Sequence, residues 1–215
     1  MATAETLIAG VIEMVCGSPD ATSANILPLL NEGLRMITGR ILLPPLETFA
    51  TVNTTLSANT SALPANYQHG LFAAQDGVKT LGIKNSKGQM ITAFGDLTQA
   101  GDVEAVAVVG SSLMYLPIPS TVVPLTIHYY RLPALLVALA SPEGFTPQNV
   151  EFGEKAMKHY AAASLWSNSE DGIDGEKVNT LYHEGQFEVM IARIQEITTE
   201  GVSPANPPYE VLTWL

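Results

Sequence analysis

Apolar residues recur at every third or fourth position in four stretches of the chain, two toward each end. This spacing places them along one face of a helix, and it predicts amphipathic helices. The stretches are residues 3–16, 21–41, 147–167 and 175–199. Because only a short acidic turn separates the last two stretches, we expect these helices to pack as an antiparallel pair.

Residues with special backbone preferences mark the ends of the predicted helices. Thr146 and Asp174 are suited to cap the third and fourth helices, and Pro147 would take the first position of the third. Pro28 lies near the beginning of the second helix and marks either its true start or a kink. The buried stripe of the last helix is expected to consist of Leu181, Phe187 or Glu188, Met190, Ile191, Ile194 and Ile197.

Between residues 46 and 131 the apolar spacing changes to the alternation that is typical of strands. The clearest case is residues 125–131, where every second side chain would face the core. Residues 112–118 contain Pro117, which lacks a backbone donor, so this strand either lies at a sheet edge or ends there. Further strands are expected at residues 46–56, at 103–109, and at 78–83 with 89–94, the last two as a hairpin around residues 85–88.

The pattern as a whole predicts an α+β fold, in which a helical bundle core is interrupted by a β-rich module. Two N-terminal and two C-terminal helices would form the core from residues 1–45 and 132–200, and residues 46–131 would form the module. Within these parts, residues 57–70 are expected to be a loop, and residues 134–140 a short apolar helix or a turn.

Residues 201–215 differ from the rest of the chain. They contain three prolines, which disfavour a helix and favour an extended arm. The arm ends in apolar side chains that are costly to leave in water, so it either folds back on its own domain or docks on a partner. Since prolines extend a chain in advance and lower the entropy lost on binding, docking is the favoured interpretation.

Composition adds two constraints. Of the 215 residues only 14% are charged and 47% are hydrophobic, whereas about a quarter are charged in an average domain. This indicates surface that is buried against partner chains; the alternative is a well-packed monomer. The net charge of −11 disfavours ordinary binding of the nucleic-acid backbone, although an acidic channel that lets DNA slide past remains compatible with it.

Chemistry-bearing motifs are absent from the sequence, so we expect neither a catalytic residue, nor a metal, nor a cofactor. His159 and His183 fall on neighbouring predicted helices near several glutamates and are the strongest metal candidates, but satisfied histidines are the simpler explanation. The acidic turn at residues 169–176 lacks the ligand spacing of a calcium loop. Because Cys16 is the single cysteine of the sequence, an internal disulfide is excluded, and we expect this residue to be a buried thiol. Neither a standard secretory signal nor an apolar run long enough for a membrane span is found.

Several segments together resemble the head-to-tail adaptor (connector, or head-completion) proteins of tailed bacteriophages. The resemblance covers roughly residues 5–200. It rests on apolar, aromatic and proline positions rather than on a catalytic signature. These are Ile26–Gly33, Leu63–Tyr67, Gly101–Glu104, Leu116–Pro119 and Ile127–Pro133, followed by Tyr160 with Trp166 on one helix and Tyr182 with Phe187 on the next.

The resemblance implies a structural protein of the virion, assembled in the host cytoplasm and located at the head–tail interface. It implies a ring, most often of twelve subunits, that docks under the portal protein, extends the DNA channel without binding DNA specifically, and offers a platform for a tail or nozzle protein. No enzyme activity, cofactor or membrane is expected. Two alternatives stay open: a neck or tail-completion protein one layer below the adaptor, and a monomeric ligand-binding β module.

Two sets of residues are candidates for contacts in such an assembly. The apolar C-terminal arm is the hypothetical portal-binding element, with Pro207, Pro208, Tyr209, Val211, Leu212, Trp214 and Leu215. The β-rich module would supply contacts to a neighbouring subunit or to the tail through Tyr115, Ile118, Tyr129 and Tyr130.

Overall fold

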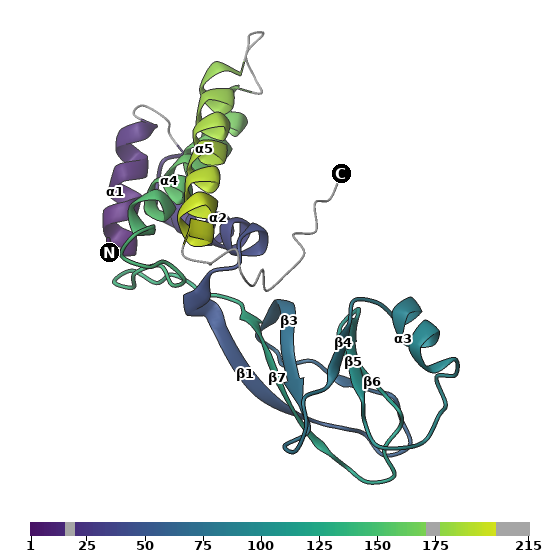
Figure 1. Cartoon of the computed structure of the whole chain (residues 1–215). Coiled ribbons are helices and arrows are strands. Elements are labelled where there is room, and N and C mark those ends of the chain that lie inside the picture. The colour runs from purple at the N-terminus through teal and green to yellow at the C-terminus, as the bar shows by residue number, and fades with distance from the viewer. Residues whose placement is uncertain (16–19, 171–176, 201–215) are drawn as a thin grey trace. The chain divides into compact units, whose positions relative to one another are not determined.

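The computed structural model describes residues 1–15, 20–170 and 177–200 (Figure 1). It confirms the α+β class, with long helices and two sheets. The chain divides into two compact units, and each is described by itself. The unit we call the helical unit consists of Met1–Leu46 and the described residues from Leu132 onward, and the unit we call the β module is Glu47–Arg131.

Four long helices form the helical unit, as predicted. They are α1 (Ala4–Met14), α2 (Ser23–Arg40), α4 (Val150–Glu170) and α5 (Val178–Glu200), with a short 3-10 turn at Pro44–Leu46. Helix α4 packs against the other three and is therefore the centre of the unit. Its core-facing side chains are small, namely Gly153, Ala156, Ala161, Ala162 and Ala163, with Met157 and Leu165. Small side chains allow the neighbouring helices to approach closely.

The helix ends differ in part from those expected. Thr22 caps α2 by accepting from the backbone N–H of Asn25, and Pro28 lies inside α2 on an exposed position, so it does not mark the start of the helix. Helix α4 begins at Val150 rather than at Pro147. The prediction fails because residues 146–149 form a separate turn, in which the side chain of Asn149 accepts from the Thr146 N–H at 2.7 Å.

Helices α4 and α5 are antiparallel, as predicted. Tyr160 of α4 packs on Phe187 of α5, with ring centroids 5.5 Å apart. Ten residues further along α4, the carboxylate of Glu170 accepts from the backbone N–H and the hydroxyl of Thr180, at 3.1 and 2.7 Å. Positions that rise along one helix therefore meet positions that fall along the other. Glu170 also caps the first turn of α5, and these hydrogen bonds lower the pKa of its carboxyl group.

The buried face of α5 consists of Thr180, His183, Phe187, Ile191 and Ile194. Three of these were expected, but Leu181 is 62% exposed and Glu188 is exposed as well. The prediction fails at the start of the helix because two polar side chains, Thr180 and His183, take the buried positions. Each has a partner there, Glu170 for Thr180 and His159 for His183.

The β module contains two sheets. One has the order β1-β7-β3, with all pairs antiparallel, and the other the order β2-β6-β5-β4. The strands are β1 (Glu47–Asn53), β2 (Thr60–Ala62), β3 (Tyr67–Gln75), β4 (Gly82–Lys84), β5 (Ala105–Val109), β6 (Ser112–Leu116) and β7 (Pro124–Arg131). Strand β6 lies between β2 and β5, so of the two alternatives for this strand it ends before Pro117 rather than lying at an edge. The alternation along β7 is confirmed, since Leu125, Ile127 and Tyr129 are buried.

The hairpin predicted from residues 78–83 and 89–94 is wrong. Residues Lys87–Phe94 form helix α3, and β4 and β5 on either side of it pair in parallel. The cause is a reciprocal cap, in which the Ser86 hydroxyl accepts from the Gln89 N–H and the Gln89 side chain accepts from the Asn85 N–H. Gly95, with φ of 71°, then ends the helix.

One further expectation needs correction, and for residues 134–140 the structure decides between the two alternatives. Residues 57–70 are not wholly a loop, because Thr60–Ala62 pair with β6 and β3 begins at Tyr67. Residues 134–140 form a turn and no helix. The carbonyl of Ala140 accepts from the N–H of Ala4 at the start of α1, so this segment is held by the first turn of another helix.

Candidate assembly surfaces

Helix α5 carries a second apolar face, which we call the outer stripe. It consists of Val178, Leu181, Tyr182 and Val189, which are between 50% and 62% exposed. On a helix of 3.6 residues per turn this stripe lies opposite the buried face formed around Phe187. An exposed stripe of large apolar side chains on a helix is typical of a surface that becomes buried against another chain.

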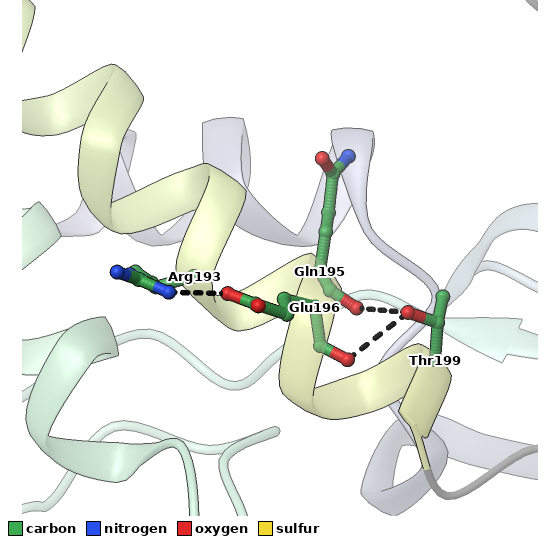
Figure 2. Close-up of polar contacts among 4 residues, drawn as sticks. All are labelled: Arg193, Gln195, Glu196 and Thr199. Atoms are coloured by element: carbon green, nitrogen blue, oxygen red, sulfur yellow. Dashed lines mark hydrogen bonds and ion pairs between the residues drawn. The ribbon is translucent and has the colours of Figure 1, made fainter.

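The outer stripe has a defined end. Beyond Val189 the same face of α5 turns polar, where the Arg193 guanidinium donates to the Glu196 carboxylate at 2.6 Å (Figure 2). Thr199, one turn further, donates its hydroxyl to the backbone carbonyls of Gln195 and Glu196 (Figure 2). The apolar surface is thus confined to the first half of the helix.

A groove of about 820 Å³ lies beside the outer stripe, between α2, α4 and α5. Its floor is formed by α4 and includes the small side chains Ala163, Ser164 and Ser167. Met36 of α2 and Leu181 of α5 stand on its two walls, and both are exposed. The groove therefore combines a floor of small side chains with walls that carry exposed apolar side chains.

The charged groups of the groove are mostly acidic. Glu188 forms an ion pair with Arg40 at 2.6 Å across α5 and α2, which leaves the carboxylates of Glu32 and Glu184 on opposite walls. Burial, together with a hydrogen bond to the Glu32 carboxylate, raises the pKa of Tyr160 to about 12. Tyr160 therefore stays neutral, and the groove presents excess negative charge to an occupant.

His159 and His183, the predicted neighbours, do meet. Their Nδ1 atoms are 2.9 Å apart, so one ring donates and the other accepts. Burial, and secondly the nearby His183, lower the pKa of His159 to about 4, and burial also lowers the pKa of His183. The pair is thus neutral near pH 7.

A metal site at His159 and His183 would need further ligands besides the two imidazole rings. Within residues 1–15, 20–170 and 177–200 there is no group of three or more His, Cys, Asp or Glu side chains that could hold one metal ion. Two of the glutamates that were expected nearby have other partners, since Glu154 accepts from the Ala2 N–H and Glu188 pairs with Arg40. The histidine pair is a contact between α4 and α5.

The tyrosines proposed for an interface lie inside the β module. Tyr115 is fully buried, and its hydroxyl accepts from the Thr55 N–H at 2.6 Å. Tyr129 is only 1% exposed, and its hydroxyl donates to the side chain of Asn66 at 2.6 Å. These rings form the core between the sheets and are not accessible to another chain.

Tyr130 is also buried, and its hydroxyl donates to the Glu47 carboxylate. The interface hypothesis therefore needs correction for Tyr115, Tyr129 and Tyr130. The alternation along β7 predicted one buried face, but near the end of this strand both faces are covered. Ile118, the fourth residue of that set, is half-buried and donates its N–H to the carbonyl of Gln99. It keeps part of its surface for a contact.

A second exposed apolar segment follows the β module in sequence. Leu135, Val137 and Leu139 are each more than half exposed, whereas Leu136 between them is buried. The Leu136 N–H donates to the side chain of Asn31 on α2, which fixes the segment on the helical unit. Exposed apolar surface is thus found at two places of this unit.

Several predicted residues lie outside the described part of the chain. They are Cys16, the proposed cap Asp174, the acidic turn from residue 171 onward, and the whole C-terminal arm with Pro207, Pro208, Tyr209, Val211, Leu212, Trp214 and Leu215. Among the helices that the structure describes, none has the length and hydropathy required to cross a lipid bilayer.

Sequence reasoning did not identify the outer stripe. Its signal was present, since Val178, Tyr182, Gly185 and Val189 follow one another at intervals of three or four residues. Gly185 leaves open space between the larger side chains, because a Cβ built there would meet nothing within 4 Å. A helix that carries two apolar stripes on opposite faces belongs between two partners.

Comparison with known families identifies one match, which extends over nearly the whole chain. The family of SU10 adaptor proteins matches residues 2–208. The resemblance to phage adaptor proteins is thereby confirmed. A search among curated proteins gives no match.

Proposed function

This chain belongs to the SU10 adaptor protein family, and from that membership we propose that it forms the head-to-tail adaptor ring of a phage virion. Twelve copies would dock under the portal protein, extend the DNA channel and carry a tail or nozzle protein. Assembly in the host cytoplasm would precede its final place at the head–tail interface. The mechanism is association between chains rather than catalysis.

The observation that supports ring formation best is the outer stripe of α5. Val178, Leu181 and Val189 lie opposite the face that holds α5 on α4, whereas the Tyr182 ring also lies edge-on to His159 of α4, with ring centroids 6.4 Å apart. Burying such side chains stabilises an assembly by roughly 1.5–3 kcal/mol for each one that becomes fully covered. Since a ring needs two different surfaces on each subunit, the stripe is proposed as one of them.

Native mass spectrometry with the cognate portal tests the proposal. We expect wild-type protein to add to the portal as a ring, and the double variant Leu181→Ser/Val189→Ser to remain monomeric with an unchanged melting temperature. Val78→Ser is the matched control, because Val78 is 95% exposed and belongs to the β module rather than to α5. A wild-type chain indifferent to the portal, or a double variant that assembles normally, would contradict the proposal.

The C-terminal arm is proposed to bind the portal. Its prolines extend the chain in advance, and its terminal Trp214 and Leu215 supply apolar anchors. Deletion of residues 203–215 is expected to abolish portal binding while leaving the folded units intact by circular dichroism. Unchanged binding by the truncated chain would remove the arm from the mechanism.

A neck or tail-completion protein one layer lower remains the nearest alternative, and only the identity of the binding partner separates the two. The monomeric ligand-binding β module stays the second alternative. The depression described on that module has a volume of about 390 Å³ and is lined by residues of β1 and of the segment around Ser61, without a charged side chain. A recognition site for a small molecule normally combines apolar walls with convergent polar groups. Ile118 is retained as a proposed contact to a neighbour or to the tail.

A further inference from the structure

We propose that the groove between α2, α4 and α5 receives helix α3 of a neighbouring copy of this chain, an inference that rests on the ring proposed above. The groove belongs to the helical unit and α3 belongs to the β module. Such a contact therefore joins two different surfaces. This is the heterologous type of contact that closes a ring of identical subunits.

The walls and floor of the groove favour a helix as its occupant. All three are helices, whose backbone N–H and C=O groups are already paired within each helix. An extended peptide would find no backbone partner there, and its own polar groups would be left unpaired. A helix satisfies its backbone internally and needs only side-chain contacts.

The dimensions of α3 match the floor of the groove. The floor runs from Tyr160 to Asn168 along α4, which corresponds to about 12 Å at 1.5 Å per residue. Helix α3 has eight residues and thus also spans about 12 Å.

The surface of α3 fits a floor of small side chains. Only Met90 is buried on its own module, whereas Gly88, Thr92 and the 43%-exposed Ile91 face outward. The glycine and threonine would permit close approach to Ala163 and Ser164, with Ile91 as the apolar anchor.

Charge favours α3 over α1 and over the C-terminal arm. Residues 87–94 contain Lys87 and no acidic residue, while the groove carries the carboxylates of Glu32 and Glu184. Helix α1 has an outward face with Glu5 and Glu13 and would be repelled. The C-terminal arm has one acidic residue and no Lys or Arg, so it lacks charge complementarity with the groove.

Disulfide cross-linking in the assembled ring tests the contact. In a Cys16→Ser background, Ile91→Cys combined with Ser164→Cys is expected to give, on mild oxidation, a ladder of covalent oligomers up to the full ring. Each single substitution alone should give no ladder. The matched control combines Val78→Cys with Ser164→Cys, because Val78 is fully accessible but not part of α3; it should not cross-link.

The outcomes separate this inference from the proposed function, because native mass spectrometry follows ring formation independently. Rings without the ladder would overturn the α3 contact and leave the adaptor ring standing, whereas absence of rings would overturn the proposed function. A disulfide within one chain, seen as a monomer of altered gel mobility, would show self-docking and also overturn the contact. A ladder from Val211→Cys with Ser164→Cys in its place would assign the groove to the arm.

Charge reversal gives a second measurement without cysteines. Lys87→Glu and Glu184→Lys are each expected to lower the ring yield several-fold, and the double variant to recover it. Recovery requires that the two side chains meet, because two unrelated defects would add. Single variants that assemble as wild type, or a double variant worse than either, would contradict the contact.

Discussion

The two units of the chain differ in charge balance and in the burial of their tyrosine side chains. The β module, residues 47–131, has four Lys or Arg against five Asp or Glu, whereas the rest of the chain has six against sixteen. The module buries Tyr115 and Tyr129 between its sheets, and the helical unit exposes Tyr182 on α5. The module is therefore held by its own core, while the helical unit presents both the negative field and the apolar surface for other chains. Substitutions in the core of the β module should therefore lower its unfolding free energy, and substitutions on the surface of the helical unit should lower the yield of assembled rings.

The strongest test of this difference is Tyr115→Ala. Removing a fully buried aromatic ring typically costs about 3–5 kcal/mol of unfolding free energy, and here it also leaves the Thr55 N–H without its acceptor. We expect faster amide exchange across β5 and β6 in hydrogen-exchange mass spectrometry. The urea midpoint followed by the fluorescence of Trp166 on α4 should stay unchanged. If the Trp166 transition moved as well, the two units would unfold as one, and the comparison would fail.

Tyr115→Phe separates the ring from its hydroxyl. The ring still fills the core, so only the hydrogen bond to Thr55 and its neighbours is lost. Because Thr55 is exposed and water can replace the lost acceptor, the cost is that of an ordinary hydrogen bond, about 0.5–1.5 kcal/mol. An exchange profile equal to that of Tyr115→Ala would mean that the hydroxyl, rather than packing, holds the module together.

Two glycines of the helical unit, one in its core and one on its surface, are expected to respond oppositely to substitution by alanine. A Cβ at Gly153 would stand 2.4 Å from the Phe145 ring, so Gly153→Ala overpacks the core and should destabilise the unit by about 1–3 kcal/mol. A Cβ at Gly185 meets nothing within 4 Å, so Gly185→Ala should stabilise α5 by up to about 1 kcal/mol. Urea unfolding monitored by Trp166 fluorescence measures both. A Gly153→Ala chain as stable as wild type would show that Gly153 is not tightly packed, and a destabilising Gly185→Ala would show that this position is not open.

The histidine pair gives the helical unit a pH dependence of its own. Its folded-state pKa values lie below the ordinary value of 6.5, with that of His159 at about 4, so the unfolded chain binds more protons between these values. The unfolding free energy therefore falls as the pH is lowered through this window, and the contribution is complete above about 6.5. Because His159 is partly exposed, we expect a loss of only about 1–2 kcal/mol.

Unfolding curves at about pH 7 and about pH 5 test the histidine contribution. Charges that face the pair are Lys155 and Lys158 on α4, which oppose protonation of His159, and Glu170, which favours it at His183. His159→Gln should flatten the pH dependence of the Trp166 transition, whereas His128→Gln in the β module should leave it unchanged. An equally steep dependence in His159→Gln would assign it to carboxylates instead.

Features that depend only on neighbouring residues, such as the buried face of a strand, could be predicted from the sequence. The alternation of Leu125, Ile127 and Tyr129 gave β7 correctly, because one face of a strand is set by its own sequence. The reciprocal cap between Ser86 and Gln89 was also readable, but the β-branched residues around it suggested a strand. In that case a specific hydrogen-bond signal outweighed propensity.

The surfaces were harder to predict because they depend on distant partners. Both faces of α5 are apolar, and the sequence does not show which one meets α4. Polar Thr180 and His183 are buried because Glu170 and His159 happen to meet them, and Leu181 is left outside. For the same reason the covering of Tyr130 could not be read from β7 alone.

The smallest expected effect concerns two ion pairs on α5. Arg40–Glu188 joins α2 to α5, and Arg193–Glu196 lies within α5, where Figure 2 shows it. Both distances are 2.6 Å, and all four side chains are more than 40% exposed. Solvent screening limits each pair to about 0.2–1 kcal/mol. Glu188→Gln should nevertheless cost more than Glu196→Gln, because the Arg40 guanidinium also lies over the Phe187 ring, 5.6 Å from its centroid, and is positioned there by Glu188. Urea midpoints at low and high salt measure the difference. Equal losses of unfolding free energy in the two variants, both abolished by high salt, would show that the Arg40–Glu188 pair contributes no more than an ordinary surface ion pair.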